Sequence, residues 1–140
     1  MSSYKFIIIP FITVIVSQLI KCITDKEGRF NLLTFFNLSG GMPSSHSSLV
    51  CSLTTIIYLK YGLSSPIFAL SLFFSLIILY DSRGVRYETG KQSKLLNEII
   101  SERNDTSYEK LQEKIGHKPI EVVCGSLLGI IMGFLLYNLF

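Results

Sequence analysis

The sequence predicts an all-α integral membrane protein, a bundle of four transmembrane helices with short interfacial helices. Hydrophobic residues make up 49% of its 140 residues and charged residues only 16%, well below the roughly 25% charge of ordinary soluble domains. The apolar residues also form long runs instead of alternating with polar ones. Because backbone groups in hydrocarbon must be satisfied within their own segment, we expect each run to be helical. The length fits one domain over residues 1–140.

Four runs are long enough to span the hydrocarbon core of a bilayer, which takes about 20 residues of α-helix. We expect these spans at residues 6–23, 47–63, 66–80 and 122–140. The first run follows Lys5, as in a signal peptide, but no small-residue cleavage site comes after it. We therefore expect it to be retained as a membrane helix.

Two polar segments, residues 24–46 and 81–121, separate the spans. An odd number of predicted helices lies between each segment and either chain end, so both segments belong on the same side of the membrane. Apolar residues in the second segment recur at helical spacing, namely Leu95, Leu96, Ile99, Ile100, Tyr108, Leu111 and Ile115. This spacing predicts short amphipathic helices lying at the interface.

The charges are distributed very unevenly between the two predicted membrane faces. Eleven of the 13 lysines and arginines and all ten acidic residues lie on the side of the polar segments, which leaves Lys5 and Lys60 on the other. Positive charge marks the cytoplasmic side of a membrane protein. We expect an inner-membrane protein with both termini outside and the polar segments in the cytoplasm. A net charge of +3 is too small to indicate a nucleic-acid partner.

The first of two histidines lies where a polar segment enters an apolar run, in the stretch GGMPSSHSS of residues 40–48. Pro43 suits the first turn of a helix, and Ser44 and Ser45 place hydroxyls beside the unpaired N–H groups of that turn. This arrangement favours an anion, phosphate above all. The alternative is an ordinary helix cap with spare serines and a surface histidine.

The second histidine, His117, stands four residues before Glu121 and just ahead of the last apolar run. If a helix begins near Pro119, the carboxylate can bind one ring nitrogen and leave the other free. A histidine prepared in this way serves as a nucleophile or base. The alternative is a structural pair at helical spacing.

Basic residues lie near the same predicted membrane face. Arg83 and Arg86 follow the third run directly, and Lys21 lies near the inner end of the first. The fork of donors on each arginine matches phosphate oxygens, and Lys21 adds a third positive charge, so all three residues are candidate phosphate ligands. Alternatively, Asp81 pairs with one of the arginines and the group is structural, or the cations only flank the spans.

The cysteines, Cys22, Cys51 and Cys124, lie in or beside apolar runs. Their odd number and wide spacing argue against both a disulfide framework and a zinc site. No cluster of carboxylates, cysteines or histidines has metal-ligand spacing. We expect neither a metal nor a cofactor.

Three glycines, Gly125, Gly129 and Gly133, are spaced four residues apart in the last run. They would form one face of a helix without side chains, which allows close approach of another helix. We expect this face to pack within the protein or across a homodimer. The alternative is that glycine is simply frequent in membrane helices.

With these motifs in view, the chain resembles the divergent branch of the type 2 phosphatidic acid phosphatase family, which consists of small integral membrane proteins. The resemblance rests on residues 40–47, on residues 80–97, which contain Tyr-Asp, Gly-Val-Arg, Gly-Lys-Gln and Leu-Asn, and on residues 116–125, which read GHKPIEVVCG. With Gln18 and Lys21 it covers essentially the whole chain.

The resemblance implies a role for each histidine. His46 would protonate the leaving alcohol, and His117, oriented by Glu121 in place of the usual aspartate, would attack phosphorus. The chain departs from the broader family because Ser45 replaces a glycine, the Lys…Arg-Pro motif is not intact, and Leu111 occupies the position of an arginine. Phosphate binding then falls to Lys21, Arg29, Arg83 or Arg86.

We therefore expect a metal-independent membrane phosphatase that hydrolyses a lipid or prenyl phosphate monoester through a phosphohistidine. A cytoplasmic site suits a lipid made on the inner leaflet, such as phosphatidylglycerol phosphate. The first alternative is a protein that binds or transports lipid phosphates without turnover. The second is a small structural membrane protein whose polar helix ends only set its topology.

Overall fold

In the computed structural model, the described residues are 4–24, 41–103, 108–113 and 117–140. Within these ranges the chain forms five α-helices and no strand, so the all-α prediction is confirmed for the described part of the chain. The helices are α1 (Lys5–Thr24), α3 (Ser45–Tyr61), α4 (Pro66–Arg83), α5 (Val85–Glu102) and α6 (Pro119–Leu139). The bundle helices begin and end within three residues of the predicted spans.

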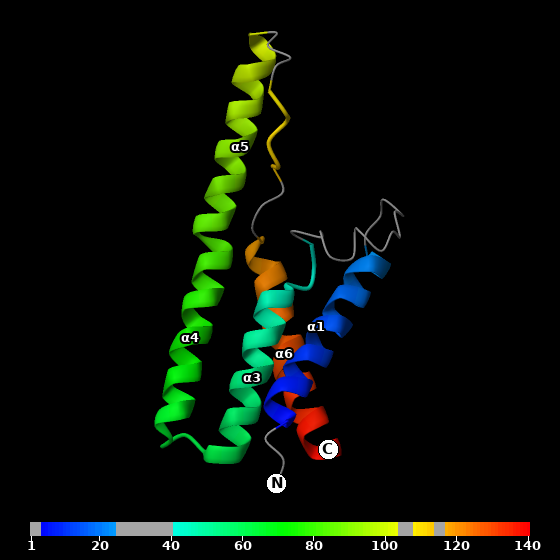
Figure 1. Cartoon of the computed structure of the whole chain (residues 1–140), viewed down its shortest axis with the longest axis vertical. Coiled ribbons are helices and arrows are strands. Elements are labelled where there is room, and N and C mark those ends of the chain that lie inside the picture. The colour runs from blue at the N-terminus through cyan, green and yellow to red at the C-terminus, as the bar shows by residue number, and fades with distance from the viewer. Residues whose placement is uncertain (1–3, 25–40, 104–107, 114–116) are drawn as a thin grey trace.

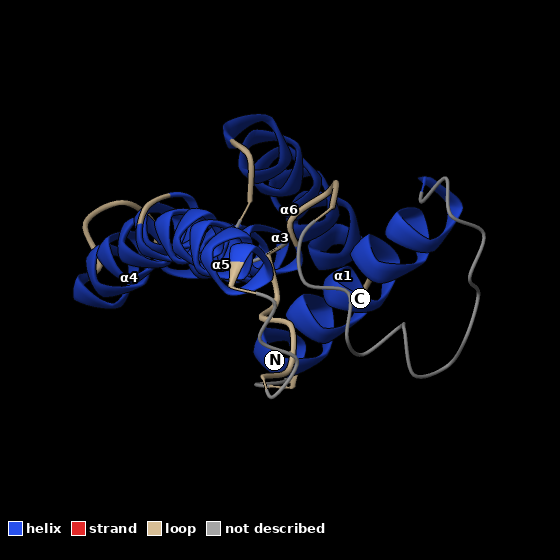
Figure 2. Ribbon diagram, turned by 90° about the horizontal axis from the view of Figure 1, so that it is seen from above, coloured by secondary structure: helices blue, strands red, loops and turns tan. Residues whose placement is uncertain are grey.

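Helix α3 is the centre of the bundle. It packs against α1, α4 and α6, and the view along the bundle shows it between them (Figure 2). Its buried side chains are mostly small and polar, including Ser47, Ser48, Ser52 and Thr55. Small hydroxyl residues allow helices to approach closely and can bond to carbonyls of their own helix.

Three helical segments are long and apolar enough to cross a membrane: Lys5–Thr24, Pro66–Glu102 and Pro119–Leu139. Helix α3 has 17 residues and six serines and threonines, and it is not among them. The prediction of four transmembrane helices is therefore confirmed only for three candidates. The neighbouring helices α1, α4 and α6 surround much of α3, so its polar side chains face these helices instead of the surroundings of the bundle.

The start of α1, the end of α6 and the turn between α3 and α4 lie at one end of the bundle (Figure 1). The two lysines predicted for this end are both there and contact aromatic rings. The Lys5 ammonium lies 5.1 Å from the ring centroid of Tyr137, and the Lys60 ammonium lies 5.1 Å from that of Phe6. Aromatic and long basic side chains together are typical of a membrane–water interface.

Helix α5 differs from the prediction of short interfacial helices. It runs on from α4 in nearly the same direction and carries the chain beyond the other helices (Figure 1). Only Gly84 separates the two helices, and its N–H donates to the Tyr80 carbonyl at 2.7 Å, so the turn hardly interrupts the helical bonding. The apolar pattern around Leu95 does belong to a helix, but the helix projects from the bundle.

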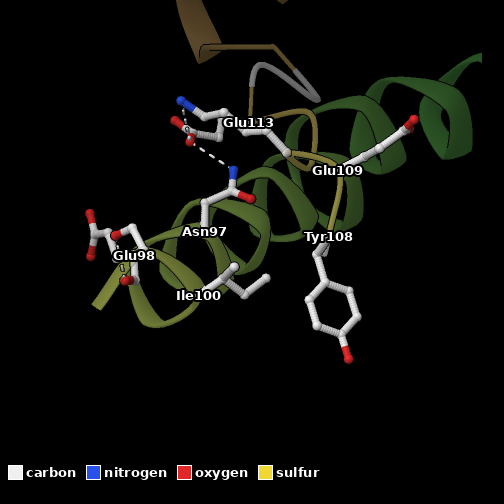
Figure 3. A pocket seen from close by; sticks show the side chains of 8 residues that line it. Asn97, Glu98, Ile100, Tyr108, Glu109 and Glu113 are labelled. Carbon is white, nitrogen blue, oxygen red and sulfur yellow. Dashed lines mark hydrogen bonds and ion pairs between the residues drawn. The ribbon is translucent and has the colours of Figure 1, made fainter. Parts of the chain in front are cut away.

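The prediction of a second amphipathic helix around Tyr108 and Leu111 is wrong for residues 108–113, because these residues are not helical. The Asn97 side chain binds this segment instead. Its Nδ2 donates to Glu113 Oε1 (Figure 3). The same Nδ2 donates to the Leu111 carbonyl, and the Asn97 Oδ1 accepts from the Leu111 N–H. These bonds satisfy backbone groups that a helix would otherwise use. Ile115 lies outside the described residues.

Segment 108–113 and α5 line an open cavity of about 340 Å³ on the projecting arm. Figure 3 shows side chains that line it, among them Glu98, Tyr108 and Glu109. The cavity lies on the arm, apart from the two predicted histidines.

The glycine face of α6 packs against α3 of the same chain. A Cβ atom built on Gly125 would lie 2.4 Å from the Ser44 carbonyl oxygen, and one on Gly129 would lie 2.4 Å from that of Ser48. On Gly133 it would lie 2.9 Å from the Cβ of Thr55. Packing within the protein is therefore confirmed. Association of two copies through this face, the other arrangement that the glycine spacing allows, stays a prediction.

Candidate active site

The start of α3 is tied to the start of α6. The Ser44 N–H donates to the Glu121 carbonyl at 3.0 Å, and Gly125, one turn further along α6, lets the Ser44 backbone approach without a clash. This junction joins the two histidine motifs, which are about 70 residues apart in the sequence. The glycine spacing predicted close packing but did not predict that it would assemble the site.

Helix α6 begins at Pro119, as the His117–Glu121 prediction required. Glu121 Oε2 accepts from the Lys118 N–H at 3.1 Å and lies 3.0 Å from His117 Nδ1. One carboxylate therefore caps its own helix and orients the imidazole. With Nδ1 bonded to an acceptor, the proton is on Nδ1 and Nε2 keeps its lone pair.

The backbone and the ring of His117 are held from different sides. Its N–H donates to the Ser82 carbonyl in the last turn of α4 at 3.1 Å, and the residue is only 5% exposed. Its ring faces that of His46 with 6.5 Å between centroids and 59° between ring planes. His46 itself, in the first turn of α3, is exposed. The two predicted histidines thus face each other at the end of the bundle opposite the termini.

Two of the predicted cations act on this pair. Burial lowers the pKa of His117 below its ordinary value of 6.5, the hydrogen bond that His117 donates to Glu121 opposes this effect, and the charges of Lys21 and Arg86 lower the pKa further. Lys21 is 4% exposed in the last turn of α1. An imidazole held neutral near neutral pH is suited to nucleophilic attack.

Arg86 and Arg83 differ in their surroundings. Arg86 Nε lies 3.1 Å from Asp81 Oδ2 with both side chains about half exposed, so the predicted pairing with Asp81 exists. The charge of Arg86 also acts on both His46 and His117. Arg83 is exposed at the end of α4. Arg29, the remaining candidate, lies outside the described residues.

The two serines before His46 have different environments. Ser44 is the N-cap of α3, where its Oγ accepts from the Ser47 N–H at 3.3 Å and from the Ser47 hydroxyl at 2.9 Å. Ser44 therefore acts as an ordinary helix cap, which is the alternative that the sequence left open for this stretch. Ser45 is 7% exposed, and its Oγ has no hydrogen-bond partner among the described residues.

Within the described ranges, no three histidine, cysteine or acidic side chains gather as they would around a metal ion. The site consists of a neutral imidazole with a free ring nitrogen, a second imidazole opposite it, a helix N-terminus and two cations. This arrangement can bind an anion and move a proton.

Comparison with known proteins agrees with the residues assembled here. The family model described as the divergent PAP2 family matches residues 2–132. The chain is 34% identical over 145 residues to the uncharacterized membrane protein YuiD of Bacillus subtilis (strain 168), a match that covers 91% of this chain and 90% of YuiD. No solved structure matches the chain. With its apolar helices and this membrane-protein relative, the chain is a membrane protein that belongs to the divergent PAP2 family.

Proposed function

We propose that the protein is a metal-independent membrane phosphatase that hydrolyses a lipid or prenyl phosphate monoester. The observation that carries this proposal is the His117–Glu121 pair, with Nδ1 and Oε2 3.0 Å apart. Binding an anion takes cations and N–H groups, whereas an oriented, buried imidazole with a free nitrogen is what a covalent step needs. Membership of the divergent PAP2 family supports the same activity.

In this mechanism the Nε2 lone pair of His117 forms a bond to phosphorus as the bond to the leaving oxygen breaks. His46 gives its proton to that oxygen, so the alcohol leaves neutral. Lys21, Arg86 and the N–H groups at the start of α3 stabilise the charge spread over the phosphoryl oxygens. A water molecule then attacks the phosphohistidine, His46 takes its proton, and the N–P bond breaks.

The placement of the site supports a substrate embedded in the membrane. Along α1, Lys21 lies 16 positions after Lys5, a rise of about 24 Å, which is less than the roughly 30 Å of a bilayer core. If Lys5 lies at one interface, the site lies near the opposite one, where lipid phosphates are. We propose that α3 crosses the membrane as the fourth span, enclosed by its neighbours.

We also propose that the site faces the cytoplasm of an inner membrane, with the termini outside. The support is the unequal distribution of Lys and Arg in the sequence, which predicts 11 of 13 on the site side. A cytoplasmic site would suit a substrate made on the inner leaflet, of which phosphatidylglycerol phosphate is one example.

The decisive experiment traps the intermediate. Detergent-purified protein is mixed with a ³²P-labelled lipid phosphate and quenched in alkali, which preserves phosphohistidine. We expect label on wild type and none on His117→Ala, with turnover lost in this variant although it inserts normally. Addition of a chelator should leave the rate unchanged.

A second substrate separates the two histidine roles. His46→Ala should slow hydrolysis of a lipid phosphate strongly but a p-nitrophenyl phosphate much less, because that leaving group needs no proton. His117→Ala should fail with both. Near wild-type turnover of His117→Ala, or a need for added magnesium, would contradict the mechanism. Binding without turnover or label would favour a lipid-phosphate binding or transport protein.

A further inference from the structure

Two buried serine hydroxyls in the bundle have no hydrogen-bond partner among the described residues, those of Ser45 and Ser82. Most other helical serines donate to a carbonyl of the preceding turn, as do Ser17, Ser48, Ser52, Ser71, Ser75, Ser101 and Ser126. A buried hydroxyl without a partner is unfavourable, so each such group calls for an explanation. Ser45 precedes His46, and the carbonyl of Ser82 holds the His117 N–H. Both unpaired hydroxyls thus belong to residues at the histidine pair.

The helix register shows which way Ser82 faces. On α4 the buried positions are Ser71, Ser75 and Ser82, and their spacing of four and seven residues places them on one face. Ser75 Oγ lies 3.2 Å from the Val50 carbonyl oxygen of α3 and 2.7 Å from Thr54 Oγ1, so this face is turned toward α3.

The same register places Ser82 along α3. Helices α3 and α4 are joined by a short turn and run antiparallel (Figure 1). Because both rise equally per residue, moving seven residues forward from Ser75 on α4 means moving seven back from Val50 and Thr54 on α3. Ser82 therefore lies opposite residues 43–47, the stretch that contains Ser45 and His46. It is 3% exposed there.

The charges around this position indicate what the missing partner is. Lys21 and Arg86 both act electrostatically on His46 and His117, and Asp81 and Glu121 act in the opposite sense. Both carboxylates are already engaged, Asp81 by Arg86 and Glu121 by His117, so a group entering beside the rings finds the cationic side chains as its available partners. A serine hydroxyl can donate one hydrogen bond, which an anionic oxygen accepts more strongly than a neutral one. Hydroxyls from two different helices beside the same two rings suit an anion with several oxygens.

We propose that Ser82 is a phosphate-binding residue, whose Oγ donates to a non-bridging oxygen of a tetrahedral oxyanion held between His46 and His117, with Ser45 as the second hydroxyl donor. The identification of the anion as phosphate rests on the proposed function. Ser82 would position the oxyanion by contacting it directly. Ser82 takes no part in proton transfer, because its hydroxyl is a poor acid and both histidines are at hand.

The test measures binding of orthovanadate, a tetrahedral analogue of phosphate, to the detergent-purified full chain by calorimetry, so it needs no turnover. We expect Ser82→Ala to weaken binding by about tenfold to 100-fold, the loss that follows from removing one hydrogen bond to a charged group. Ser82→Thr keeps the hydroxyl and should bind within a few fold of wild type. The matched control is Ser71→Ala, on the same face of α4, whose hydroxyl bonds only to Phe68.

Substrate kinetics give a second readout. Ser82→Ala should raise KM for a phosphate monoester by a similar factor, and its pH profile should keep the acid limb of wild type because the His117–Glu121 pair is intact. A merely structural role would instead reduce the fraction of folded protein, seen by gel filtration, and leave the vanadate affinity of the folded fraction unchanged. Should Ser82→Ala not stay monodisperse, Ser82→Cys replaces it as a near-isosteric variant with a weak donor.

The outcomes separate this proposal from the phosphatase itself. If wild type binds vanadate but never turns over lipid phosphate, the phosphatase proposal fails and the Ser82 assignment is still decided by the variants. If wild type turns over and Ser82→Ala binds vanadate as wild type does, a bound water fills the site of the hydroxyl and the Ser82 assignment is overturned. Absence of vanadate binding to wild type at saturating concentration overturns it as well.

Discussion

The contact between α3 and α6 at Gly129 allows a quantitative prediction. A Cβ atom at this position would lie 2.4 Å from the Ser48 carbonyl oxygen and 2.9 Å from the Cβ of Cys51. Ordinary contact starts near 3.4 Å, so in Gly129→Ala the two helices must separate locally by about 1 Å. A carbonyl oxygen is fixed by its helix and cannot rotate aside as a side chain does.

Two opposing effects set the magnitude for Gly129→Ala. Overpacking costs about 1–3 kcal/mol, and we take the upper end because the obstacle is backbone. The alanine gains about 1 kcal/mol from its higher helix propensity. We expect the free energy of unfolding to fall by about 2 kcal/mol. Gly129→Leu, with a larger side chain in the same place, should lower the yield of folded protein severely.

The assay is SDS titration in mild-detergent micelles, followed by the reactivity of the Cys51 thiol with Cys22 and Cys124 replaced by serine. Cys51 is half-buried next to the mutated position and becomes reactive as the helices part. The control is Leu127→Ala on the same helix, at a side chain that is 55% exposed, which should change the free energy by less than about 0.5 kcal/mol. A Gly129→Ala protein as stable as wild type would refute the close contact.

Two further predictions concern pH and orientation. The nucleophile must be unprotonated, so activity is present above the folded pKa of His117 and is lost as the pH falls through it, which places the acid limb of kcat/KM below pH 6.5. Glu121→Gln removes interactions that raise the pKa of His117, so it should move the acid limb to still lower pH and reduce the rate by about 10²-fold. The control Glu109→Gln, on the exposed arm, should change neither the limb nor the rate. An acid limb that moves to higher pH in Glu121→Gln would contradict the assignment. For orientation, a membrane-impermeant thiol reagent is added to intact cells that carry a single introduced cysteine. It should label a cysteine placed at Leu63, in the turn before α4, and should not label one placed at Ser101 on α5. The reverse pattern of labelling would place the site outside.

The extent of the helices follows largely from the sequence. Long apolar runs can satisfy their backbone only as helices, so α1, α4 and α6 are predicted to within three residues. The pairing of His117 with Glu121 follows for the same local reason, because a helix that starts at Pro119 brings residues four apart together. Contacts between residues on the same helix can therefore be predicted from their spacing in the sequence.

Residues that meet across the bundle could not be predicted from spacing. The glycine face of α6 fits a second copy as well as a helix of the same chain until α3 is seen against it. The bonding of Asn97 to Leu111 overrides an apolar pattern that is typical of a helix, and no local signal announces it. Arg83 and Arg86 read alike in the sequence, yet only the charge of Arg86 is found acting on the histidines in the described structure.

The sequence by itself therefore determined that this chain is helical, that it belongs in a membrane, and that two histidines lie at helix starts on one face. Tertiary structure decided that those histidines face each other, because the bond from Ser44 to Glu121 and the absence of a side chain at Gly125 bring α3 against α6. It also decided that Ser82, one ordinary helical serine among many in the sequence, lies beside His117 with a hydroxyl that has no hydrogen-bond partner among the described residues. Contacts within one helix repeat with its turn, whereas contacts between helices depend on which faces pack and in what register.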